Sequence, residues 1–401
     1  MLNERQTIKG LKNPIMTVAT FVVLLLAFNP DWGGSSLLWW VCVALFIFVF
    51  LITQRELFIN SGYVMWTIVF LVYCTVSCFW AVSTSLAINA LKNMMVKALL
   101  LIILSSILRT KADIERLLKI IVLICSINAI YLLVENVDML FGGDIGNRLG
   151  TEGDWNANTI GMMMAFASIV LVYLMERQKS KIYKFLCVML ILFLVFVSFV
   201  TGSRKAFLMV IAGLSAFLIL SANKKIKWLV FLIICGVSVG VYSLVMSEPY
   251  LYSVLGRRLE GLMASIIGVG TVDGSTETRE LYIKVGIQVF EDNFLVGCGL
   301  DCFRVLNRNI SGDAMYAHNN YVEILADLGI LGALIYYWMY VIILSRLFKK
   351  LRNGGLLTKL FIVLMGLLII LDYGCVSYNS YLFQILILIS FNWLNICKND
   401  L

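Results

Sequence analysis

Residues 185–200 of this chain read FLCVMLILFLVFVSFV, an apolar run that contains no charged side chain. A helix of about 20 apolar residues crosses the ~30 Å hydrocarbon layer of a bilayer, so the run indicates a membrane span. Similar runs recur throughout the 401 residues, of which 61% are hydrophobic and 14% are charged. A soluble domain is nearer half apolar and a quarter charged. The sequence therefore predicts an all-α membrane protein.

Beyond that run, we expect about twelve transmembrane helices in a single polytopic domain, residues 1–401. The first apolar run is not a cleaved signal, because no small-residue cleavage site follows it. In the fourth span, Lys92 and Lys97 are costly unless they snorkel or face a cavity. The expected spans are residues 13–28, 35–53, 62–80, 88–108, 117–136, 158–175, 183–200, 205–222, 226–247, 321–345, 358–375 and 379–397.

The basic residues set the expected orientation of the chain. With the N-terminus in the cytoplasm, 20 of the 32 Lys and Arg residues fall in inside loops, at inside span ends or at the termini, as the positive-inside rule requires. Both termini are then cytoplasmic, and the protein belongs in the cytoplasmic membrane. The net charge of +8 follows from this distribution, so we expect no nucleic acid as a partner.

One extracytoplasmic loop, residues 248–320 between the ninth and tenth spans, is far longer than the other connections. Loops of that length in compact proteins are usually functional or disordered, and this one contains foldable stretches. Residues 277–293 suit a helix capped by Thr276, although their alternating apolar residues also suit a strand; we favour the helix. Arg279 lies in its first turn, where free backbone N–H groups favour an anion.

The single histidine, His318, lies at the outer end of the tenth span, in residues 316–321 (YAHNNY). Asn319 or Asn320 can cap the helix that starts there. The dipole at a helix N-terminus disfavours the imidazolium, and a neutral imidazole is what a general base requires. Glu323, in the first turn of that helix, has a supporting role at most. The alternative is a histidine hydrogen-bonded at the membrane interface.

A short turn between the seventh and eighth spans, residues 201–206 (TGSRKA), places Arg204 and Lys205 at the outer boundary. Two positive charges there oppose the positive-inside bias. The donors of a guanidinium match phosphate oxygens, so Arg204 is a candidate for binding an anion. The alternative is an arginine that snorkels to lipid headgroups.

Several signatures of nucleotide and metal chemistry are missing from the sequence. It has no Gly-Lys-Ser/Thr phosphate loop, no Asp-x-Asp pair for a metal-bound nucleotide sugar, and no His/Cys cluster for zinc. We therefore expect no metal and no cofactor. Because the candidate residues lie outside the cell, the energy for a reaction must arrive with the substrate. A lipid diphosphate would supply it as a leaving group.

The order of these pieces resembles the O-antigen ligase/polymerase superfamily of bacterial membrane glycosyltransferases. The matching stretches lie between residues 148 and 335, and the number of spans extends the likeness over most of the chain. One departure is Phe294, which stands where the family often has Pro; it concerns the rigidity of a turn. The stretches are Arg148 with residues 154–161 (DWNANTIG), residues 201–206 (TGSRKA), residues 275–299 with Arg279 and GCG at 297–299, and residues 318–332 (HNNYVEILADLGILG).

The resemblance implies a metal-independent transfer of a glycan from undecaprenyl diphosphate to an acceptor hydroxyl. By the resemblance, His318 would be the catalytic base, and Arg204 and Arg279 would bind the diphosphate. It also implies an undecaprenyl-diphosphate-linked glycan donor and acceptor, membrane lipid, and flippase and chain-length regulator proteins as partners. The supporting site candidates are Arg148, Asn158, Lys205, Asn319 and Glu323.

The identity of the acceptor distinguishes two related activities. A polymerase joins lipid-linked repeat units into O-antigen, capsular or exopolysaccharide, whereas an O-antigen ligase transfers the glycan to lipid A-core. The Ser-Arg-Lys-Ala form of the turn and the Ala-His-Asn-Asn-Tyr form around His318 favour a polymerase. Two other classes stay open. One is a non-enzymatic transporter of lipid-linked glycans, for which the sequence lacks the expected inverted repeats and Gly- or Pro-broken helices. The other is a structural membrane protein with the long loop as an interaction domain.

Overall fold

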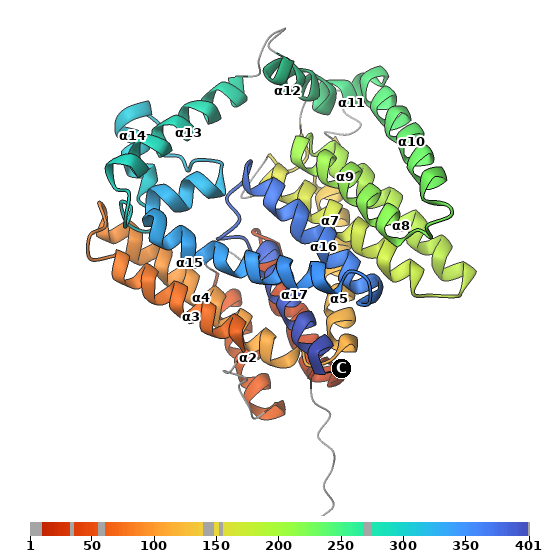
Figure 1. Ribbon diagram of the computed structural model, residues 1–401, viewed down its shortest axis with the longest axis horizontal. Coiled ribbons are helices and arrows are strands. Elements are labelled where there is room, and N and C mark those ends of the chain that lie inside the picture. Colours follow the sequence, from red (N-terminus) through yellow and green to blue (C-terminus); the bar gives the residue numbers. More distant parts are fainter. Residues whose placement is uncertain are drawn as a thin grey trace, which may run out of the picture.

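The computed structural model describes residues 10–32, 36–54, 61–138, 148–151, 155–267 and 274–399, and the regular elements in these ranges are helices (Figure 1). The connection between α10 and α15 holds α11 (Pro249–Leu251), a π-helical turn (Tyr252–Gly256), α12 (Arg257–Ile267), α13 (Gly274–Asp292) and α14 (Phe303–Ser311). The long apolar helices are α1 (Pro14–Phe28), α2 (Leu37–Thr53), α3 (Gly62–Ser77), α4 (Thr84–Ile107), α5 (Lys111–Glu135), α7 (Ala157–Glu176), α8 (Lys181–Val200), α9 (Arg204–Ser221), α10 (Lys227–Ser247), α15 (Asn320–Lys350), α16 (Gly355–Asp372) and α17 (Tyr381–Asn399).

Among the described residues, eight helices are long and apolar enough to cross a membrane: α4, α5, α7, α8, α9, α10, α15 and α16. Helices α1, α2, α3 and α17 are apolar but shorter. Each of the twelve expected spans coincides with one of these helices, with ends shifted by a few residues. The all-helical membrane fold is therefore confirmed, while the number of helices that cross the bilayer stays a prediction.

Three capping residues fix where α7, α9 and α15 begin. The side chain of Asn156 accepts hydrogen bonds from the N–H groups at the start of α7, and Ser203 does so for α9. Asn319 caps α15 by accepting from two backbone N–H groups. A cap of this kind satisfies donors that the helix leaves free. The register of these three helices, which meet at the site described below, is thus set by local sequence.

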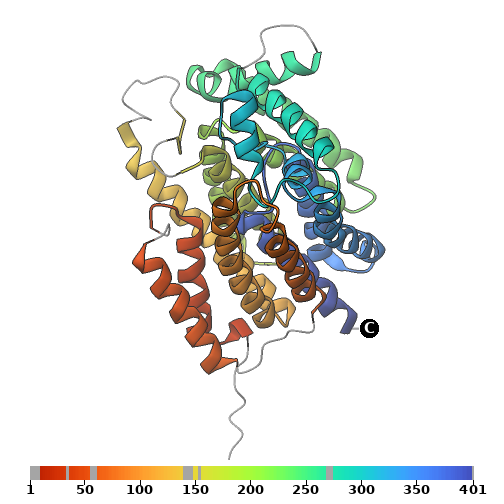
Figure 2. The ribbon, with the colours of Figure 1, turned by 90° about the vertical axis from the view of Figure 1, so that its left-hand side faces the viewer.

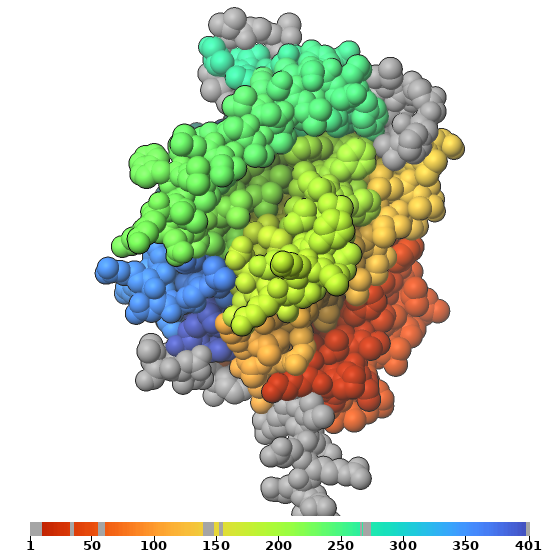
Figure 3. Space-filling model, turned by 90° about the vertical axis from the view of Figure 1, so that its right-hand side faces the viewer, coloured from red at the N-terminus to blue at the C-terminus, as the bar shows by residue number. Residues whose placement is uncertain are grey.

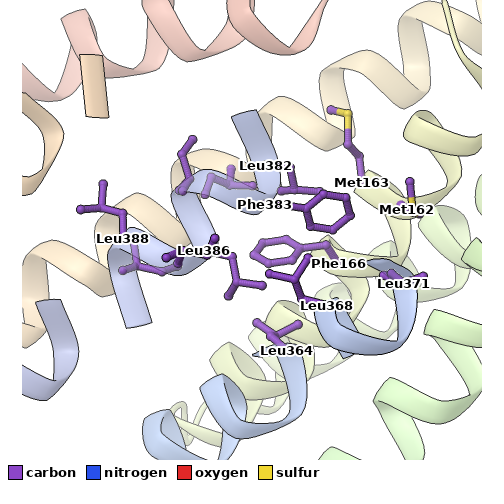
Figure 4. Packing of buried hydrophobic residues seen from close by; sticks show 14 of the residues in the cluster. Met162, Met163, Phe166, Leu364, Leu368, Leu371, Leu382, Phe383, Leu386 and Leu388 are labelled. Atoms are coloured by element: carbon purple, nitrogen blue, oxygen red, sulfur yellow. The ribbon is translucent and has the colours of Figure 1, made fainter. Parts of the chain in front are cut away.

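Helix α7 lies at the centre of the bundle. Of its most apolar 18 residues 83% are buried, against 6% for α10, which lies on the face shown in Figure 3 together with α8. In the core, Phe166 of α7 packs among Leu364 and Leu368 of α16 and Phe383 of α17 (Figure 4). The exposed apolar surface of α10 suits a helix that faces lipid.

The connection between α10 and α15 gathers at one end of the molecule, where α13 lies beside α14 above the α3–α4 pair (Figures 1 and 2). Residues 277–293 were expected to be a helix, and α13 confirms this. The expected cap is wrong: α13 starts at Gly274, so Thr276 lies inside its first turn. Its hydroxyl accepts a hydrogen bond from Arg204 instead.

Helix α15 is broken at Gly329, whose φ of 65° and ψ of −170° are not helical. Residues 294–299 fill the break. Backbone hydrogen bonds run from Cys298 N to Ala326 O (2.9 Å) and from Ile330 N to Phe294 O (2.9 Å). A Cβ built on Gly329 would lie 2.4 Å from the carbonyl oxygen of Leu295, so this close approach requires glycine.

This break corrects the expectation that the chain has no Gly-broken helix. The sequence pattern missed it because the apolar run continues unchanged through Gly329, and only the docking of a distant loop reveals it. The break is not an open midplane site of the transporter type, since its backbone groups are paired. Nearby, the buried Asp327 accepts from the N–H groups of Asp301 (3.0 Å) and Phe303 (2.7 Å), which fixes the start of α14.

Candidate active site

A cavity of about 760 Å³ opens where the ends of several helices meet. Its walls come from α1, α2, α4, α7, α9, α14, α15 and α17 and from the connection between α16 and α17. Apart from α4, which contributes its middle, these are the helix ends that the charge distribution predicts to be extracytoplasmic. Four of the candidate residues line it: His318, Lys205, Asn158 and Glu323.

His318 is held on both sides by its neighbours in the chain. Asn319 accepts from the N–H groups of Tyr321 (3.0 Å) and Val322 (3.2 Å) and so anchors the residue that follows His318. The buried carboxylate of Glu323 accepts from the N–H of Ala317 (2.6 Å), the residue before it. His318 itself has a φ of 55°, an uncommon value for a residue other than glycine. Such conformations cluster at functional sites.

Aromatic rings flank the imidazole. The ring of Tyr316 lies 4.2 Å from that of His318, centroid to centroid, and the ring of Tyr282 stacks on it at 6.2 Å. Burial, and then the positive charges of Arg279 and Lys205, lower the pKa of His318 from 6.5 to about 3. The imidazole is therefore neutral. The sequence pointed to a neutral imidazole through the helix dipole, whereas burial and two neighbouring cations account for it here.

Lys205 and Arg279 supply those two cations. Lys205 is half-buried, lines the cavity, and forms no hydrogen bond or ion pair with any described residue. Its side chain packs against Gly374, where a built Cβ would lie 3.0 Å from the lysine Cε. Arg279 is likewise unpaired among the described residues. It was expected in the first turn of its helix, but α13 starts at Gly274, so Arg279 lies in the second turn, beyond the free N–H groups. A half-buried cation without a counter-ion is costly, which suits a site that receives an anion.

Arg204 occupies a different place. Its guanidinium donates to Thr276 Oγ1 (3.1 Å), to Ser275 Oγ (3.4 Å) and to the carbonyl oxygen of Arg258 (3.3 Å). It does not line the cavity. It joins the start of α9 to the start of α13, the helix that carries Arg279. The sequence could not foresee this, because Ser275 and Thr276 lie about seventy residues further along the chain.

Two further candidates have separate positions. Arg148 donates from Nε to the carbonyl oxygen of Thr201 (2.9 Å), so it supports the turn that precedes Arg204. Asn158 lies in the first turn of α7, at the wall of the cavity. Asp154, which belongs to the same stretch of sequence, lies outside the described residues.

Sequence reasoning missed several residues of the cavity. Arg304 lines it but is paired with Asp301 at 2.5 Å. Lys97 also lines it, whereas Lys92 is exposed. The signal for Lys97 was its place inside an apolar span, which marks either a snorkelling lysine or a cavity. Within the described ranges, no group of three His, Cys, Asp or Glu side chains is arranged to hold a metal ion.

His318 and Lys205 line one cavity at the ends of apolar helices, and the charge of Arg279 also acts on the imidazole. A neutral imidazole near two cations suits a general base and the binding of an anion. Residues 189–337 match the O-antigen ligase family model. This match, which contains Arg204, Arg279 and His318, supports the assignment of the chain to the O-antigen ligase/polymerase superfamily, whose members are glycosyl-transferring enzymes. No curated protein matches the chain.

Proposed function

We propose that this protein polymerises undecaprenyl-diphosphate-linked oligosaccharide repeat units into O-antigen, capsular or exopolysaccharide. The reaction takes place at the outer face of the cytoplasmic membrane and uses no metal. The observation that carries the proposal is the neutral His318 beside the unpaired Lys205 in one cavity. A base and a cation at the same place suit attack by a hydroxyl on a sugar that leaves from a diphosphate.

In the proposed step, His318 accepts the proton of the acceptor hydroxyl. The hydroxyl oxygen bonds to the anomeric carbon of the donor sugar as the bond from that carbon to the diphosphate oxygen breaks. Undecaprenyl diphosphate leaves with the electron pair. Lys205 and Arg279 stabilise its negative charge, and Arg204 both adds to this positive site and holds the start of α13 in place.

Donor binding also strengthens the base. A pKa of about 3 makes His318 a weak base in the unloaded protein. The charges of Arg279 and Lys205 are two of the causes of this low pKa. A bound diphosphate offsets those charges, so the pKa of His318 rises toward the range in which general bases work best. The site therefore activates the acceptor hydroxyl only when the donor is present.

The polymerase is preferred to the ligase on the form of the two motifs, Ser-Arg-Lys-Ala and Ala-His-Asn-Asn-Tyr. The same cavity would serve a ligase, whose acceptor is lipid A-core. A transporter without chemistry has no need for a neutral base near two cations.

Flippase and chain-length regulator proteins are the proposed partners. The flippase would deliver repeat units, and the regulator would limit the length of the product.

The test uses purified protein in lipid and an undecaprenyl-diphosphate-linked repeat unit from the host. Products are separated by gel. A ladder of several repeats supports the polymerase. Transfer that appears only when lipid A-core is added would move the assignment to ligase. Translocation of the substrate without any new glycosidic bond would overturn both and favour the transporter.

A further inference from the structure

Lys97 lines the cavity but has no part in the proposed reaction. It stands in the middle of α4, an apolar helix, yet it lines the cavity together with Asn93, one turn earlier on the same face. A lysine at such a place is expensive and marks a functional site by default.

The partners of Lys97 leave its charge uncompensated. The ammonium donates to the backbone oxygen and the side-chain oxygen of Asn379 and lies 4.8 Å from the centroid of the Tyr381 ring. No described carboxylate pairs with it. Neutral oxygens and an aromatic face orient a cation but do not cancel its charge. Among the described residues, the surroundings of Lys97 therefore suit the binding of an anion.

Lys97 and Lys205 contact opposite ends of the same segment, the connection between α16 and α17. The segment between α16 and α17 touches Lys205 at Gly374 and Lys97 at Asn379. These two residues are five positions apart, so their Cα atoms are at most about 18 Å apart. His318 lies at the Lys205 end, because the charge of Lys205 acts on it. The cavity thus offers one cation whose charge acts on the base, and a second cation, Lys97, that is not among the charges acting on it.

The surroundings of Lys97 suit a prenyl lipid. A small apolar void of about 10 Å³ lies between α1, α2, α4 and α17, with Tyr381 in its wall. Leu100, Leu101 and Leu104 line it and follow Lys97 by one to two turns of α4. A phosphate at Lys97 would therefore lie one to two helical turns from apolar side chains, the kind of surroundings that a prenyl chain requires.

We propose that Lys97, with Asn379 and Tyr381, is a second phosphate-binding subsite, which takes the diphosphate of the polyprenyl-linked acceptor. This rests on the proposed function, in which two lipid-diphosphate substrates meet. The donor diphosphate lies at Lys205, where the bond breaks. The acceptor presents its hydroxyl to His318, and its own diphosphate, at the other end of its repeat unit, is held at Lys97.

The first test measures binding and needs no activity. Farnesyl diphosphate, a short polyprenyl diphosphate, is titrated into the purified full-length chain, and bound copies are counted by native mass spectrometry. We expect two copies on the wild type, one on Lys97→Met, and two on the matched control Lys92→Met, which alters an exposed lysine of the same helix. Two copies on Lys97→Met, or one on the wild type, would overturn the subsite.

A second variant keeps the test valid if Lys97→Met misfolds. Lys97→Gln removes the charge but keeps a donor for Asn379, and we again expect one bound copy. Because these counts do not depend on turnover, a wild type that binds two copies and forms no polymer would refute the proposed function and leave the subsite standing.

The role of Lys97 in acceptor binding is tested with two acceptors that cannot act as donors. One carries its diphosphate and the other lacks it. Loss of one charge-assisted contact predicts that Lys97→Met raises KM for the full acceptor by about 10- to 100-fold. It should leave KM unchanged for the acceptor without diphosphate. An equal rise for both acceptors would show that Lys97 only supports the structure, and would contradict the proposal.

Discussion

At the scale of single residues, the protonation of His318 can be observed directly, because it is the only histidine in the chain. With a pKa lowered to about 3, its imidazole should stay neutral at pH 5, where a free histidine is mostly protonated. NMR of isotope-labelled histidine measures this. Protonation of His318 should therefore cause no loss of kcat/KM between about pH 8 and pH 5.

The same spectra test the cause of that shift. Lys205→Met and Arg279→Gln each remove a positive charge, so the pKa of His318 should rise in both variants. Lys92→Met, on an exposed residue, serves as the control and should leave the titration unchanged. A wild-type midpoint near 6.5 would refute the burial and the charge arrangement described for this site.

Glu323 acts on His318 through the backbone. Its buried carboxylate accepts the N–H of Ala317 at 2.6 Å, and leaving that donor unpaired costs about 1–3 kcal/mol. We expect Glu323→Ala to lower kcat by up to about 100-fold through misplacement of the base. The KM for the donor should be unaffected. Glu323→Gln retains an acceptor oxygen and should restore most of the rate; equal losses in both variants would contradict a positioning role.

At the scale of elements, the break in α15 depends on Gly329. Its positive φ costs an alanine about 1–3 kcal/mol, and the added Cβ would meet the Leu295 carbonyl at 2.4 Å. Gly329→Ala should therefore undock residues 294–299 and lower Tm in detergent. Gly236→Ala in α10, where nothing lies within 4 Å, is the matched control and should be neutral or slightly stabilising. Equal Tm values for the two variants would contradict this.

Most elements could be predicted from the sequence, because an apolar run and a capping residue are local signals. Asn319 was one of the two expected caps for the helix after His318, and the structure confirms it. The break at Gly329 could not be predicted, since it is stabilised by hydrogen bonds to residues about thirty positions earlier. For the same reason the partners of Arg204 were not foreseen: its motif is local, whereas Ser275 and Thr276 are brought to it by the fold.

At the scale of the whole molecule, the predicted orientation in the membrane rests on the basic residues alone. We expect a cysteine at position 314, in the exposed loop before α15, to react with a membrane-impermeant maleimide on intact spheroplasts. A cysteine at position 223, between α9 and α10, should react only after permeabilisation. The wild type, with its ten native cysteines, gives the background. The reverse pattern would place the cavity on the cytoplasmic side and contradict the proposed reaction.

The cavity belongs to this scale too. Its lining residues are spread from Leu26 to Phe383 in the sequence, so no single stretch of sequence predicts the cavity. His318, Lys205 and Asn158 were singled out as separate motifs, and the fold brings them to one place. In the sequence, Lys97 stood out because a lysine is unusual in an apolar span. Only the packing of α4 against the start of α17 places its ammonium beside Asn379 and Tyr381 at the cavity wall.

The central claim is that His318 activates the acceptor hydroxyl, and the most direct measurement is the single-turnover rate of glycan transfer by His318→Ala beside the wild type. Loss of a general base predicts a rate about 10²- to 10⁴-fold lower, with farnesyl diphosphate binding retained. A variant that binds the diphosphate and transfers glycan within a few-fold of the wild-type rate would contradict the account.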